Sequence, residues 1–214
     1  MSASATARVR ENMARRHFNT ANLFANRCIE LEQANSSQPW PQSCWQEHQS
    51  YASASVIMSG AALEAFINEF FLDACDGGGG NLSSIQPPTL KLLEQLWLGF
   101  DRISPLRKFQ VALTACSVDP FPLGEEPYQS AADLLALRNA LVHFKPEWDD
   151  EPGEHMNLER RLAGKFATNS LAPPTGMKWF TGRCLGSGCA SWALEGVRTF
   201  MMDFFKQLKV PYTM

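Results

Sequence analysis

The spacing of apolar residues along the chain matches helices of about 3.6 residues per turn far more often than the alternation typical of strands. Stretches with this helical spacing end at glycine, proline, asparagine or serine. They cover residues 8–35, 44–75, 89–100, 105–116, 128–144, 157–166 and 187–208. Few β-branched alternating runs interrupt them. The pattern predicts an all-α protein, an antiparallel helical bundle of five to seven helices.

Two breaks in this pattern define the expected domain organisation. Asp76 and the four glycines after it end the second stretch, and the glycine run lacks the Gly-Lys-Ser/Thr ending of a phosphate-binding P-loop. Residues 147–186 form a loop-rich insertion: 147–154 are acidic and turn-like, and 168–186 are rich in proline and glycine, which predicts an ordered loop or hairpin before the C-terminal helix. We expect a single domain over residues 1–214, with a core of about 8–146 plus 187–208.

Composition narrows the class of protein. The 214 residues are 45% hydrophobic and 19% charged, as in soluble domains large enough to bury a full core. The net charge of −3 argues against a protein that coats nucleic acid non-specifically, although it allows a local basic cleft. We find no leader-like segment and no uninterrupted apolar run of about 18 residues, so we expect a cytoplasmic protein that does not span a membrane. The six cysteines are then expected to be free thiols.

The end of the fifth predicted helix concentrates the chemical groups of the chain. It carries Arg138, Asn139 and His143, and Pro146 follows shortly after. A guanidinium can hold two phosphate oxygens, an imidazole can accept and donate protons, and the dipole at a helix C-terminus favours a cation. Together these groups suit attack of a ribose 2′-hydroxyl on the adjacent phosphate, a reaction that needs no metal.

The spacing of these residues limits what one helix can do. Asn139 and His143 lie about 40° apart around the helix axis, whereas Arg138 and His143 lie about 140° apart. Two copies of the helix about a two-fold axis would place both sets of side chains around one cleft. The alternative is a helix end without catalytic function, at which Arg138 pairs only with Asp133 or Glu147.

The segment from Arg138 to His143 resembles the signature of the HEPN superfamily, an arginine followed by a polar residue and, after four to six intervening residues, a histidine. Here four residues intervene and Asn139 is the polar residue. The helix Gly60–Phe70, the helix start Ser104–Phe109 and the Lys-Pro pair after the histidine are also similar to HEPN-like proteins. The resemblance covers about residues 45–146, with a looser match at the C-terminal helix.

Membership of this superfamily implies a single HEPN-like bundle that dimerises with the two signature helices facing each other. Many members are metal-independent endoribonucleases of toxin–antitoxin, phage-defence or RNA-processing systems. The resemblance thus implies Arg138, Asn139 and His143 as catalytic residues, RNA as the substrate, no cofactor, and an antitoxin or other protein as a further partner. Lys145 stands where some toxin members carry a tyrosine modified by a partner nucleotidyltransferase, so that control is not expected. The competing reading is a catalytically inactive module that binds a nucleotide or a protein.

Two other features offer candidate chemistry. Glu64 lies in a small and apolar stretch, where it either orients Arg138 or His143 or is an ordinary surface or paired glutamate. Cys184 and Cys189 form a Cys-x4-Cys loop, but a zinc ribbon needs a second such pair and His155 would supply only a third ligand. We therefore expect buried structural thiols and no metal site.

The remaining candidates have simpler explanations. Arginines on the first helix could line an RNA path, but a solvated helix face is favoured. Trp179 and Phe180 could stack on a base, but packing in the core or a lid is favoured. His17 and His48 have no partner signal and are expected to be structural or solvated.

Overall fold

Helices supply the secondary structure in the part of the chain that the computed structural model describes, residues 10–35, 40–79, 82–100, 102–148, 153–169, 171–172 and 177–211. The elements are α1 (Ala14–Ala34), α2 (Gln42–Cys75), α3 (Pro87–Phe100), α4 (Pro105–Ala115), α5 (Tyr128–Val142), α6 (Glu154–Leu162), the single turn η2 (Trp179–Arg183) and α7 (Ser187–Leu208). No strand occurs within these residues, which confirms the predicted all-α bundle.

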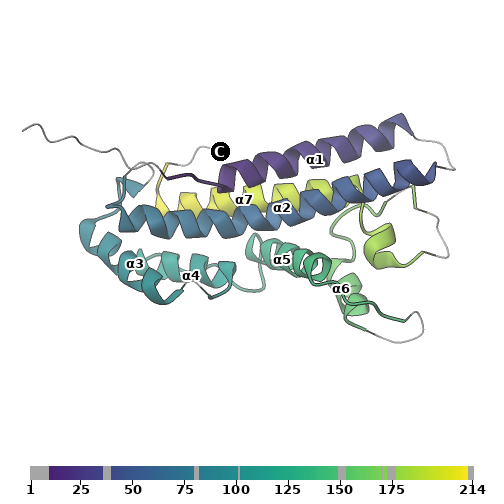
Figure 1. Ribbon diagram of the computed structural model, residues 1–214. Helices are drawn as coiled ribbons and strands as arrows, with labels where there is room; N and C mark the ends of the chain where they lie inside the picture. Colours follow the sequence, from purple (N-terminus) through teal and green to yellow (C-terminus); the bar gives the residue numbers. More distant parts are fainter. Residues whose placement is uncertain are drawn as a thin grey trace, which may run out of the picture.

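The long helix α2 lies at the centre of the bundle. α1 and α7 run along one side of it, and α3, α4 and α5 lie along the other, with α6 beyond α5 (Figure 1). Small side chains make this close packing of several helices possible, because they let neighbouring backbones approach. The buried small residues of α2 are Ala52, Ser55, Ser59, Gly60, Ala62 and Ala74. The small-residue pattern had predicted a central helix, and the structure has one.

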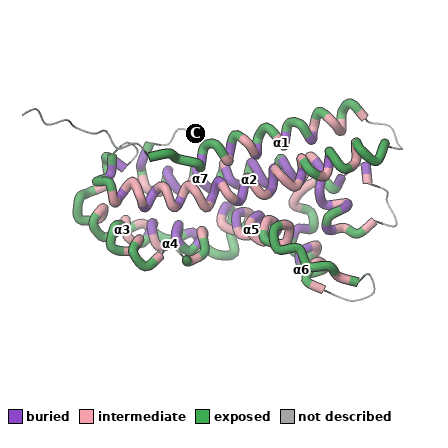
Figure 2. The backbone as a smooth tube through the Cα atoms, in the orientation of Figure 1, coloured by how far each residue is buried: buried purple, intermediate pink, exposed green. Residues whose placement is uncertain are grey.

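A cluster of phenylalanine rings joins α7 to α2 and α4. Phe109 of α4 packs edge-on against Phe200 and Phe204 of α7, each with ring centroids 4.9 Å apart, and Phe70 of α2 lies 5.4 Å from Phe204. Burial of such a ring is worth about 1.5–3 kcal/mol. The faces that the helices turn toward one another are correspondingly buried (Figure 2). The C-terminal helix therefore shares one core with the earlier helices.

α2 also has the length and apolar character of a membrane-spanning helix, which the sequence pattern had not predicted. An 18-residue window of it has a mean hydropathy of 1.3. Half of that window is buried inside the bundle, as in the central helix of a helical protein.

Several predicted boundaries differ from the observed ones for local reasons. α5 ends at Val142 instead of 144, because His143 leaves the helical conformation with ψ at 42° while its N–H still donates to the Asn139 carbonyl. α6 begins at Glu154, earlier than the predicted residue 157, after an extended Gly153. Ser104 precedes α4 as predicted, but its side chain makes no capping hydrogen bond. The first helix begins at Ala14 and not at the predicted residue 8, because residues 10–13 are not helical; residues 8 and 9 lie outside the described residues.

Candidate functional site

Arg138 is held in one orientation by contacts with α2. Its Nη2 donates to Glu64 Oε2 at 3.1 Å and its Nη1 donates to Asn139 Oδ1 at 3.0 Å. Gly60 makes room for the aliphatic part of the side chain, since a Cβ at that position would lie 3.0 Å from Arg138 Cγ. The side chain is 24% exposed, and its buried Nε has no hydrogen-bond partner among the described residues.

The predicted alternative partners of Arg138 are engaged elsewhere. Asp133 is buried and pairs with Arg161 and with Lys165, whose Nζ lies 2.8 Å from Asp133 Oδ2. Glu147 Oε2 lies 3.1 Å from His155 Nδ1. The expectation that Arg138 pairs with Asp133 or Glu147 is therefore wrong, because the packing of α5 on α2 presents Glu64 instead. Glu64 contacts Arg138 and not His143, so the first of its two suggested orienting contacts is the one formed.

Arg138 and Glu64 line an open groove of about 720 Å³. Its other walls are residues 102–106, which form the connection from α3 and the first residues of α4, and one face of α5. Arg102 is exposed on that connection and adds a second guanidinium to the lining. The groove thus has room for an anion beside two arginines, one of which is fixed in place.

His143 lines a different groove. It is exposed at the end of α5 and lines a hollow of about 370 Å³ between α5 and α6, together with Lys145 and Arg161. Lys145 Nζ lies 3.4 Å from Glu154, so part of the positive charge there is compensated. Asn139 lines both this groove and the groove of Arg138. The structure therefore places the three predicted residues on one ridge, with Asn139 between two grooves that Arg138 and His143 face separately.

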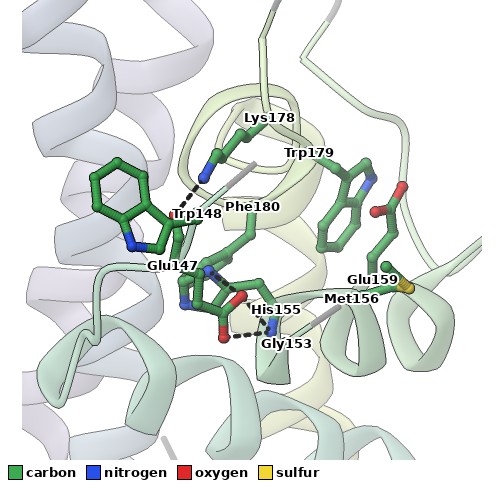
Figure 3. Close-up of a pocket in the computed structure, with 9 residues that line it drawn as sticks. All are labelled: Glu147, Trp148, Gly153, His155, Met156, Glu159, Lys178, Trp179 and Phe180. Atoms are coloured by element: carbon green, nitrogen blue, oxygen red, sulfur yellow. Dashed lines mark hydrogen bonds and ion pairs between the residues drawn. The ribbon is translucent and has the colours of Figure 1, made fainter. Parts of the chain in front are cut away.

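A third pocket, of about 230 Å³, lies next to this ridge and contains several aromatic rings (Figure 3). Phe144, the residue after His143, stacks on His155 with ring centroids 5.3 Å apart, and His155 packs on Phe180 at 4.6 Å. Lys178 Nζ donates to the Glu147 carbonyl at 2.7 Å across the pocket. His155, which the sequence offered only as a third metal ligand, is thus part of an aromatic cluster.

The tryptophans of this pocket differ in their surroundings. Trp148 is 78% exposed at its rim, whereas Trp179 stacks on Phe166 with centroids 6.4 Å apart. Phe180 is buried, in keeping with the lid packing favoured for it. The pocket therefore offers one exposed aromatic face, beside the lysine and the histidine.

The arginines of α1 and the segment before it are mostly paired on the surface. Arg10 pairs with Asp73 and Asp76, and Arg27 pairs with Glu30 at 2.8 Å. This agrees with the solvated face favoured for them. Arg8 lies outside the described residues.

One polar cluster escaped the sequence analysis. Glu32 Oε1 accepts hydrogen bonds from His48 Nε2 and from the Ser187 N–H, both at 2.7 Å, and its Oε2 accepts from Ser187 Oγ at 2.5 Å. Cys28 Sγ lies 3.9 Å from Oε1. His48 is fully buried and packs between Trp40 and Trp45. The available signal was the spacing of Cys28 and Glu32, one helical turn apart.

Burial and hydrogen bonding act in opposite directions on this cluster. Burial raises the pKa of the Glu32 carboxyl, but hydrogen bonds from His48 and Ser187 outweigh it and leave the pKa below its ordinary value. Burial, followed by the nearby Glu32 charge, raises the pKa of the Cys28 thiol to about 12. The carboxylate is thus ionised and the thiol protonated near neutral pH.

Comparison of the chain with protein-family models, with curated proteins and with solved structures gives no significant match.

Proposed function

We propose that the protein is a metal-independent endoribonuclease of the HEPN type whose active site forms when two copies bring their α5 ends together. The observation that supports this most is the ridge on α5, where Asn139 stands between the grooves of Arg138 and His143. Arg138 and His143 are both accessible to solvent but face different grooves, so one chain carries two incomplete parts of an active site. A second copy, related by a two-fold axis, would set its His143 against the Arg138 of the first.

Each composite site would use one histidine, one arginine and one asparagine. His143 takes the proton of the ribose 2′-hydroxyl, whose oxygen attacks the adjacent phosphorus while the bond to the 5′ oxygen breaks. The imidazolium formed in this way then gives the proton to that leaving oxygen. Arg138 holds the phosphate and stabilises its growing negative charge, and Asn139 orients the phosphate or the arginine. The products are a 2′,3′-cyclic phosphate and a 5′-hydroxyl end.

The rigidity of Arg138 supports this role. A catalytic guanidinium is most effective when it need not reorganise during the reaction. Glu64 and Asn139 each hold one of its terminal nitrogens, and Gly60 lets its stem lie against α2. Glu64 is 42% exposed, so an incoming phosphate can share the guanidinium with it.

The surface around His143 supports a second copy as the partner. Val142 and Phe144, which flank His143, are 48% and 49% exposed. Exposed apolar side chains at a helix end gain free energy when another surface covers them. A partner α5 would cover them and deliver its own histidine to the same place.

The test is cleavage of a labelled RNA by purified protein in the presence of a chelator. Wild type is expected to yield cyclic-phosphate ends, and His143→Ala to lose about 10²-fold or more of the rate. A mixture of His143→Ala and Arg138→Ala chains should regain part of the activity, because mixed dimers restore one intact composite site. Equal cleavage by wild type and His143→Ala would reject the proposal.

A second candidate function rests on the larger groove. Its volume of about 720 Å³ lies in the range of small-ligand sites, and its arginines suit a phosphate group. A catalytically inactive, nucleotide-binding module would use this groove without His143. In that case Arg138→Ala abolishes nucleotide binding, whereas His143→Ala binds the nucleotide as wild type does. Neither wild type nor His143→Ala cleaves RNA.

A further inference from the structure

Three donor side chains from α1 and α2 meet at one end of the bundle. This is the end where α1 finishes, α2 begins and the chain enters α7 (Figure 1). Donor atoms of Cys28, Glu32 and His48 all lie within 4.8 Å of one another. Cys28 and His48 are fully buried.

The spacing of these donors is close to what zinc requires. Zn–S bonds of about 2.3 Å and Zn–N or Zn–O bonds of about 2.0 Å at tetrahedral angles place S and O about 3.5 Å apart, and N and O about 3.3 Å apart. The observed separations are 3.9 Å for Cys28 Sγ to Glu32 Oε1 and 2.7 Å for His48 Nε2 to Glu32 Oε1. Shifts of about half an ångström, within the reach of side-chain rotation, bridge the differences.

The surroundings of the donors also fit a bound cation. The Ser187 N–H and hydroxyl already orient the Glu32 carboxylate. Carboxylates that bind a metal are typically held by hydrogen bonds from other residues in this way. Gln49 Nε2 faces His48 Nδ1 at 3.4 Å, and Gln49 Oε1 is buried without a hydrogen-bond partner among the described residues. Rotation of the Gln49 amide would let its Oε1 accept a hydrogen bond from a protonated His48 Nδ1. The present hydrogen bond from Gln49 Nε2 to the Leu185 carbonyl would then be lost.

We propose that this cluster binds a zinc ion through Cys28, Glu32 and His48. Binding releases the Cys28 thiol proton, and the imidazole proton moves from Nε2 to Nδ1, so that one thiolate, one carboxylate and a neutral imidazole hold the ion. The ion would connect α1 to α2 at this end of the bundle. The site is separate from the ridge on α5 and is independent of the proposed ribonuclease.

The test is titration of the reduced, metal-free protein with Co²⁺ as a spectroscopic probe. We expect one equivalent to bind, with the tetrahedral visible bands and the thiolate-to-cobalt charge-transfer band, and Zn²⁺ to displace it. Trp40 and Trp45, with rings 5.2 and 5.9 Å from that of His48, should lose fluorescence when Co²⁺ binds. One equivalent of Zn²⁺ should also raise the midpoint of thermal unfolding.

Matched variants decide whether the named residues bind the ion. Cys28→Ser should weaken Co²⁺ binding more than about 10-fold and remove the charge-transfer band, while Cys116→Ser at the end of α4 should behave as wild type. Circular dichroism identifies any variant that fails to fold, and His48→Gln then serves as a further ligand variant. Wild type without a charge-transfer band, or Cys28→Ser with the wild-type spectrum and affinity, would overturn the proposal in favour of a dry thiol cluster in which Glu32 only caps α7.

Discussion

Gly60 of α2 and Arg138 of α5 pack so closely that any side chain at residue 60 would press on the arginine. A Cβ there would lie 3.0 Å from Arg138 Cγ and 3.2 Å from its Cβ. The glycine therefore fixes where the guanidinium stands relative to Glu64, one helical turn further along α2. A residue with no functional group of its own thus controls the geometry of the candidate site.

This close contact predicts that Gly60→Ala raises the stability of the protein but lowers its cleavage activity. Alanine gains about 0.5–1 kcal/mol of helix stability over glycine, but the displaced arginine should lose about 10-fold or more of the RNA cleavage rate. Urea unfolding and cleavage kinetics measure the two effects. Gly99→Ala on α3, where an added Cβ meets no atom within 4 Å, is the control and should stabilise without affecting cleavage. Full activity in Gly60→Ala would show that the position of Arg138 is not important.

Glu64→Gln tests the orienting carboxylate. The amide keeps the shape of the side chain but removes the charge that holds Arg138 Nη2 at 3.1 Å. The pair is partly exposed, so we expect the free energy of unfolding to change by less than about 1 kcal/mol. The cleavage rate should fall about 10-fold or more because the guanidinium is less well fixed. Glu30→Gln, at an exposed surface pair on α1, should change neither quantity, and an unaltered rate in Glu64→Gln would remove the orienting role.

Asp133→Asn should destabilise the protein through the loss of a buried carboxylate. Asp133 is 1% exposed and neutralises both Arg161 and Lys165. Removing one partner of a fully buried pair costs about 3–5 kcal/mol, and the partial exposure of both cations reduces the expected loss to about 2 kcal/mol. Urea unfolding of the variant against wild type measures it. A change as small as that of a surface pair would mean that water screens this network.

The Cys116 thiol predicts a loss of stability in alkali. Burial raises its pKa from about 9.0 to about 11 in the folded protein. The unfolded chain therefore ionises first, so this contribution to stability is intact below about pH 9 and declines as the pH rises toward 11. Unfolding free energies between pH 8 and 11 should fall less steeply in Cys116→Ala than in wild type. Parallel curves for the two proteins would contradict the prediction.

Local pattern predicted the helices but not all of their ends. α7 spans Ser187–Leu208 as its apolar spacing predicted, because its wide apolar face is continuous and glycine precedes it. The end of α5 was placed two residues too late, since Pro146 disfavours helix only at the residue before it. The turn at His143 depends on its surroundings and not on the sequence immediately around it.

The sequence by itself determined the all-helical class, the central place of α2 and the chemical groups on α5, because helical spacing, side-chain size and residue type are properties of short segments. Only the tertiary structure decided which partners these groups have. Glu64 lies 74 residues from Arg138, and Cys28 and His48 lie on different helices, so no spacing rule connects the members of either pair. Helix packing brings such residues together, because burying apolar faces sets the register of one helix on another, and the polar side chains near those faces follow.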